Sequence, residues 1–172
     1  MRPFASTRVL TMLAATGVLL GAINPPAALA EGEAEKRWKL MNQIRQDKFD
    51  LVLPEVMREN NVDMWITVNR EGYNDPLTPD FGEGYVGDWG YYVFTDRGDD
   101  RLERVALGIG SHLIEENGAY DLVTSDFDLL EFVRERDPKS IALNYAEHIG
   151  GADGLTHTAF QKLTSTLGDK YA

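Results

Sequence analysis

The sequence has no cysteine and only three histidines. Without cysteine the chain forms no disulfide and no thiolate metal site, and a lipid-modified N-terminal cysteine is excluded. His112, His148 and His157 form no H-x-H or H-x-x-x-H pair that one short element could offer to a metal. His148 and His157 flank a glycine-rich turn that contains Asp153, so a metal ligand set or a small hydrolase site there is an alternative hypothesis. No activated nucleophile accompanies them, and surface histidines are the simpler interpretation.

Positive charge is also scarce. The chain carries 17 Lys and Arg against 28 Asp and Glu, a formal net charge of −11. This balance argues against nucleic acid and against anionic membrane surfaces as partners. A solvated acidic surface is the ordinary explanation, and it selects no particular ligand.

The first thirty residues have the pattern of a secretory signal peptide. Arg2 and Arg8 form a basic segment without a twin arginine, residues 9–23 are apolar, and residues 28–30 (Ala-Leu-Ala) form a small-x-small cleavage signal. The apolar segment is short for a bilayer span, so an uncleaved membrane anchor is the less favoured alternative. The sequence therefore predicts a signal peptide at 1–30 and one domain at 31–172, exported to the periplasm or secreted, with no membrane contact after cleavage.

Residues 49–69 predict a helix that leads into a buried strand. The helical stripe consists of Phe49, Val52, Leu53, Val56 and Met57, with Asp50 as the N-cap and Pro54 in the first turn. Residues 62–68 are dense in β-branched and aromatic side chains and predict an interior strand. A charged amphipathic helix at 31–48 precedes them, with Trp38, Met41 and either Ile44 or Arg45 on one face.

The remaining pattern predicts a hairpin followed by two strand–helix units. Residues 91–95 and 102–107 are the hairpin strands, and 120–124 and 140–145 are further strands. Helices are predicted at 111–116, at 127–136 and near the C-terminus. The second starts at Ser125 and Asp128 and buries Leu129, Leu130, Phe132 and Val133; the last has a Thr158–Gln161 capping box and a Phe160, Leu163, Leu167 stripe. The fold class is therefore α/β, a three-layer α/β/α domain with a mixed sheet of about five strands.

Residues 71–90 predict a long loop rich in Gly, Pro, Asp and aromatic residues. Residues 82–87 match G-x-G-x-x-G, but no strand precedes them and no helix follows, so the segment does not predict nucleotide binding. Four carboxylates, Asp75, Asp80, Glu83 and Asp88, lack calcium-loop spacing and are interpreted as solvated. The aromatic side chains of the loop indicate a partner surface.

Two segments resemble a known family. Residues 58–66 (Arg-Glu-Asn-Asn-Val-Asp-Met-Trp-Ile) with 69–71 (Asn-Arg-Glu), and residues 143–145 (Leu-Asn-Tyr) with 152–156 (Ala-Asp-Gly-Leu-Thr), resemble the amino-terminal domain of the creatinase, prolidase and Xaa-Pro aminopeptidase family. The resemblance covers nearly all of 36–172. It implies a ribonuclease-H-like domain of the creatinase N-terminal type, which normally precedes a pita-bread catalytic domain.

The resemblance also implies how such a domain works. The two divalent metal ions of the family belong to that missing domain, so this chain is expected to hold no cofactor, no metal and no catalytic residue. It implies a substrate-gating wall, often contributed by the neighbouring subunit, at Asn69, Arg70, Glu71, Tyr73 and Trp89. The expected function is assembly and gating in an exported metallopeptidase, with a homo-oligomer or the missing domain as partner and peptide substrate only in the full enzyme. The alternative is a free-standing periplasmic binding or interaction module.

Overall fold

The computed structural model describes residues 32–99 and 101–171, and residues 32–172 form one compact unit. The predicted signal peptide at 1–30 lies outside the described residues, so its prediction stays untested. Within the described ranges, no helix is both long and apolar enough to cross a bilayer.

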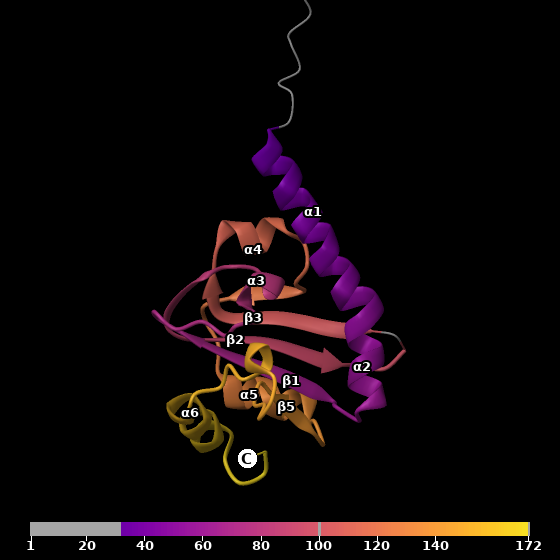
Figure 1. Ribbon diagram of the computed structural model, residues 1–172. Coiled ribbons are helices and arrows are strands. Elements are labelled where there is room, and N and C mark those ends of the chain that lie inside the picture. Colours follow the sequence, from indigo (N-terminus) through magenta and orange to yellow (C-terminus); the bar gives the residue numbers. More distant parts are fainter. Residues whose placement is uncertain (1–31, 100, 172) are drawn as a thin grey trace, which may run out of the picture. The chain divides into compact units, whose positions relative to one another are not determined.

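A five-stranded sheet forms the centre of the unit (Figure 1). Its order is β4-β3-β2-β1-β5. The bounds are β1 Met64–Arg70, β2 Tyr85–Asp96, β3 Leu102–Gly110, β4 Leu122–Thr124 and β5 Ile141–Leu143. The pairs β1–β2 and β2–β3 are antiparallel, whereas β1–β5 and β3–β4 are parallel. The predicted α/β class with a mixed sheet of about five strands is confirmed.

The two faces of the sheet carry separate hydrophobic cores. Strand side chains alternate, so Met64, Ile66 and Val68 of β1 join one core while Trp65 packs against the other. The first core is completed by α5 (Leu129–Arg136) and α6 (His157–Leu167). The second is completed by the helices α2 (Leu53–Glu59), α3 (Thr78–Phe81) and α4 (His112–Glu116) and by the turn that joins α2 to the preceding helix α1 (Glu33–Asp47). Helices therefore cover both faces.

The predicted boundary between the first two helices is wrong. The chain passes from α1 through a π-helical turn, Lys48–Val52, straight into α2 (Figure 1). Asp50 is inside that turn and caps nothing. Pro54 explains the turn, because a proline ring clashes with the carbonyl four residues earlier; here the N–H of Leu53 bonds to the carbonyl of Lys48, five residues back. The π turn also rotates the predicted stripe, which leaves Val52 and Val56 exposed while Phe49 and Met57 are buried.

Two further helix starts differ from the prediction. The side chain of Asp128 caps α5 by accepting from the N–H of Glu131, and Ser125 lies outside the helix. Thr156, rather than Thr158, caps α6 by accepting from the N–H of Ala159. Starting α6 at His157 places Ala159, Leu163 and Leu167 on the buried face and leaves Phe160 exposed; Leu130 of α5 is only half-buried.

Half of the predicted long loop at 71–90 is helix or strand. It contains α3, and β2 begins at Tyr85. The register between β2 and β3 shifts between Val86 and Tyr91, because β2 has extra residues there. Gly108 faces this bulge with a φ of +67°, and a Cβ on it would lie 2.4 Å from the carbonyl oxygen of Trp89. A glycine is therefore required at the crossing.

Candidate functional site

Four strands end at the same edge of the sheet. Because β2 runs opposite to β1 and β3, while β4 and β5 run parallel to their neighbours, the carboxyl ends of β1, β3, β4 and β5 share one edge. Open α/β sheets place functional loops at such an edge. Two buried polar clusters follow strands that end there.

The first cluster, called here the Asp75 cluster, consists of Asn69, Asp75, Asn144 and Gly154. Asn69, the penultimate residue of β1, is only 1% exposed. Its Oδ1 accepts hydrogen bonds from the backbone N–H of Asp75 and from the hydroxyl of Thr78, both at 2.9 Å. These two bonds fix the start of α3 against the end of β1. The Nδ2 of Asn69 is buried and has no acceptor among the described residues.

Asp75 connects this loop to β5. The residue is 2% exposed, so the prediction that it is solvated is wrong. Its Oδ2 accepts from the Nδ2 of Asn144 at 2.7 Å, and its Oδ1 accepts from the N–H of Leu77 at 2.9 Å. The Oδ1 of Asn144 in turn accepts from the indole N–H of Trp65 at 2.8 Å. Burial raises the pKa of the Asp75 carboxyl, against the lowering effect of the bonds from Leu77 and Asn144.

Gly154 closes the cluster. A Cβ at this position would lie 2.0 Å from the Oδ2 of Asp75, so only glycine permits the approach. The neighbouring N–H of Leu155 donates to the backbone carbonyl of Asn144 at 2.9 Å. Residues from both resemblance segments, Trp65 and Asn69 in the first and Asn144 and Gly154 in the second, therefore meet around one buried carboxylate.

Of the predicted gating residues, Arg70, Glu71 and Tyr73 form a tight turn at the end of β1, next to the Asp75 cluster. Arg70 and Tyr73 bond to each other through both backbone N–H groups at 3.0 Å, and the guanidinium of Arg70 lies 5.6 Å from the centre of the Tyr73 ring. Glu71 and Tyr73 are exposed. Trp89 is paired with Arg70 across β1 and β2 and is half-buried against the first core. The structure thus brings Arg70, Tyr73 and Trp89 to one edge, whereas Asn69 anchors the turn from below.

The histidines are not brought together into a recognisable site. His148 is exposed beside Glu147, with 3.7 Å between the Nε2 and Oε2 atoms, and His157 is the exposed first residue of α6. Within residues 32–99 and 101–171, no group of three His, Asp or Glu side chains is arranged to hold a metal ion.

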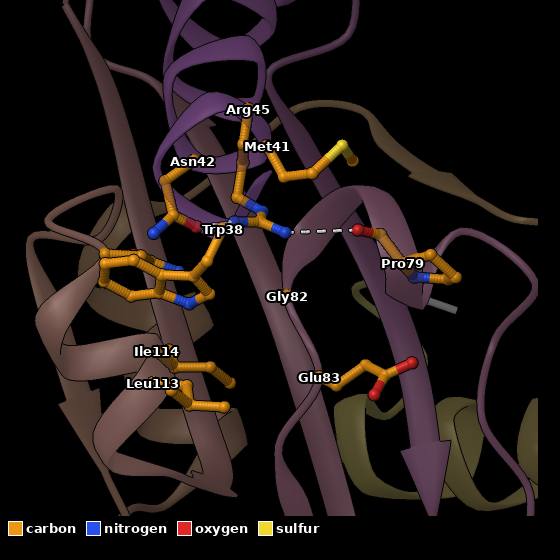
Figure 2. Close-up of a pocket in the computed structure, with 10 residues that line it drawn as sticks. Trp38, Met41, Asn42, Arg45, Pro79, Gly82, Glu83, Leu113 and Ile114 are labelled. Atoms are coloured by element: carbon orange, nitrogen blue, oxygen red, sulfur yellow. Dashed lines mark hydrogen bonds between the residues drawn. The ribbon is translucent and has the colours of Figure 1, made fainter. Parts of the chain in front are cut away.

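The second cluster was not predicted from the sequence. A pocket of about 220 Å³, called here the Arg45 pocket, opens between α1, α3 and α4 (Figure 2). Its lining comprises Trp38, Met41, Asn42, Arg45, Pro79, Gly82, Glu83, Leu113, Ile114 and Asn117. Arg45 is 7% exposed. Its guanidinium donates to the carbonyl oxygens of Asp80 at 2.8 Å and Pro79 at 3.2 Å, and to the side-chain oxygen of Asn42. The sequence held one indication of this cluster, because either Ile44 or Arg45 was expected on the face of α1 that carries Trp38 and Met41.

Comparison of the chain with protein-family models, with curated proteins and with solved structures finds no match. The functional argument therefore depends on the residues and their geometry.

Proposed function

We propose that this chain is the non-catalytic N-terminal domain of an exported metallopeptidase of the Xaa-Pro aminopeptidase type. The finer fold assignment, a ribonuclease-H-like domain of the creatinase N-terminal type, is part of the same proposal. The observation that carries it is the Asp75 cluster. The two segments that resemble this family lie far apart in the sequence, yet their residues converge on the Asp75 carboxylate. The hydrogen bond from Asn144 to Asp75 joins residues 69 positions apart. A shared structural role explains why both segments accompany each other.

The Asp75 cluster supports a gating role because it fixes the loop that follows β1. Asn69 and Asp75 hold the segment from below, and the paired backbone bonds between Arg70 and Tyr73 hold the turn above. A preordered turn with an exposed aromatic ring loses little conformational entropy when it contacts a peptide. The two divalent metal ions, the peptide and the catalytic groups belong in this proposal to a further domain, with Arg70, Glu71, Tyr73 and Trp89 as its wall.

Two measurements test this proposal. The protein 31–172, assayed with added manganese or cobalt, is expected to leave an Xaa-Pro peptide uncleaved; cleavage above the buffer level contradicts a non-catalytic role. The DNA beyond codon 172 is expected to continue into a frame with Asp, His and Glu metal-ligand motifs. In that longer protein, Tyr73→Ala should raise KM for the peptide by about tenfold or less and change kcat little, because a wall residue supplies uniform binding. Tyr145→Ala, an exposed tyrosine outside the turn, is the matched control.

The second candidate is a free-standing periplasmic binding or interaction module. The observation that favours it is that residues 32–172 form one compact unit with a core on each face of the sheet. A stop codon after position 172 followed by an unrelated gene would favour this candidate over the first.

Self-association is the partner proposal common to both candidates. Leu40, Met41 and Ile44 of α1 are exposed, and so is Tyr85 at the start of β2. Exposed apolar area of this kind usually finds a partner, and salt screens the repulsion between acidic copies. We expect a dimer of 31–172 whose formation increases with salt in sedimentation. Trp89→Ala should weaken it more than Trp65→Ala at matched fold stability, although both rings are half-buried. A strict monomer at low and high salt contradicts the proposal.

A further inference from the structure

The Arg45 pocket contains a buried cation without an acidic partner. Among residues 32–99 and 101–171, no carboxylate oxygen lies within ion-pair distance of the Arg45 guanidinium, which donates only to two backbone carbonyls and to Asn42. The carbonyls of Pro79 and Asp80 near the end of α3 explain why Arg45 holds that turn. They supply partial charges only, so the full positive charge keeps a strong affinity for an anion.

A second donor lies beside this cation. Asn117 is 4% exposed, and its Oδ1 accepts from the N–H of Ala119 at 2.8 Å. Its Nδ2 donates no hydrogen bond to the described chain. Both groups lie beside Gly82: a Cβ on Gly82 would lie 3.3 Å from the Nδ2 of Asn117 and 3.6 Å from the Cζ of Arg45. A cation and an unpaired amide donor therefore line the same part of the pocket.

The rest of the pocket is mostly apolar. Figure 2 shows Trp38 on one side of the opening together with Leu113 and Ile114, and Met41 near Arg45. The volume, 220 Å³, exceeds the roughly 150 Å³ of an engineered apolar cavity that binds benzene. The pocket therefore has room for a small apolar group in addition to a carboxylate.

We propose that the Arg45 pocket binds a small monocarboxylate that carries an aliphatic or aromatic group. The carboxylate accepts hydrogen bonds from the Arg45 guanidinium and the Asn117 amide, and the apolar group lies against Trp38 and Leu113. This chemistry is shared by free organic acids and by the C-terminus of a peptide that ends in an apolar residue. The site lies between α1, α3 and α4 and is independent of the gating turn at Arg70–Tyr73.

Glu83 is the charged residue in the pocket lining that opposes the binding of a carboxylate. It is exposed and is the single acidic side chain among the pocket-lining residues that the structure describes. Its negative charge repels a bound carboxylate, and the acidic surface of the chain does so at longer range. Affinity for a carboxylate should therefore rise when Glu83 is neutralised and with moderate salt that screens the surface repulsion.

The test is calorimetric titration of the protein 31–172 with phenylacetate and with the neutral isostere phenylacetamide. Phenylacetate should bind about tenfold more tightly, since hydrogen bonds to a charged group are worth about twice those to a neutral one. Equal affinity for the two compounds, or no binding of either, overturns the proposal. Titration with Ala-Phe and with Ala-Phe amide distinguishes the sources: tighter binding of the free dipeptide than of phenylacetate assigns the site to peptide C-termini, and weaker binding assigns it to free acids.

Exposed variants keep the test independent of folding. Leu113→Gln and Leu113→Glu remove the same apolar contact at the opening, but only Leu113→Glu adds a negative charge. Phenylacetate affinity should therefore be about tenfold lower for Leu113→Glu than for Leu113→Gln. Glu83→Gln should increase affinity a few-fold. Arg45→Gln should abolish the preference for phenylacetate over phenylacetamide. If Arg45→Gln does not fold, the pair at position 113 decides: an equal response of Leu113→Glu and Leu113→Gln overturns the proposal.

Discussion

The Asp75 cluster and the Arg45 pocket are both buried polar groupings beside strands that end at the same sheet edge, but one is closed and the other is open. Around Asp75, each carboxylate oxygen has a donor, and Gly154 excludes any added atom. The Nδ2 of Asn69 lacks an acceptor there among the described residues, but it is buried. Around Arg45, in contrast, the charge faces a pocket that Asn117 also lines. A closed cluster stabilises one arrangement of the chain, whereas an open one retains unused binding capacity.

Gly154→Ala should have the largest effect, because the closed cluster has no space for a methyl group. The new Cβ would lie 2.0 Å from the Oδ2 of Asp75, and the backbone near Leu155 must shift. We expect a loss of about 3 kcal/mol of unfolding free energy in urea denaturation. Gly151→Ala is the matched control, since nothing lies within 4 Å of its added Cβ. Equal stability of the two variants would show that the cluster is not closed.

Asp75→Asn should cause the second-largest loss of unfolding free energy. In every orientation of the new amide and of Asn144, two donors face each other or face the N–H of Leu77 or Trp65. One buried donor is left without an acceptor, at a cost of about 2 kcal/mol.

The pH dependence of that loss has a definite sign. Burial raises the pKa of the Asp75 carboxyl in the folded protein above its ordinary 3.8. The stability that this group contributes is therefore fully present below pH 3.8 and declines as pH rises through the higher folded value. The difference between the wild type and Asp75→Asn should be largest near pH 3 and smaller at pH 7 in urea denaturation. A difference that grows toward pH 7 would contradict the raised pKa.

Arg45→Met should have the smallest effect on stability, about 1 kcal/mol in the same measurement. Water can enter the pocket and bond to the carbonyls of Pro79 and Asp80 once the guanidinium is removed. No buried charge is left behind. If Arg45→Met destabilised the protein as much as Asp75→Asn does, the Arg45 pocket would be a closed structural cluster, and the contrast between the two would fail.

The sheet was predictable because strand patterns are local. Residues 91–95 are all aromatic or β-branched, residues 102–107 alternate, and the hairpin that they predict is present in β2 and β3. The polar clusters were not predictable in the same way. Nothing near Asp75 in the sequence distinguishes it from the acidic residues around it, and its burial depends on Asn144 and Gly154, which reach it only in the folded chain.

The errors at helix starts also arise because packing in the folded chain, and not the local sequence, decides the outcome. Thr156 and Thr158 are both acceptable N-caps in the sequence, and the choice between them depends on which side of α6 meets the sheet. Asn69 was predicted on the basis of the resemblance as part of an exposed wall, and the structure places its side chain beneath the turn. Arg70, Tyr73 and Trp89 lie at one edge of the sheet. Their role in gating stays a prediction.

The π-helical turn at Lys48–Val52 sets the phase of the whole N-terminal helical segment. In a regular α-helix each residue advances about 100° around the axis, so positions spaced strictly by four drift away from a common face. The wider turn cancels part of that drift, and Arg45, Phe49 and Met57 all stay inward although they are separated by multiples of four. Converting this turn to ordinary α-helix without removing a residue would rotate Met57 by about 100° relative to Arg45. The π-helical turn thus links the two helices: the orientation of α1 over the Arg45 pocket depends on how α2 packs against the sheet.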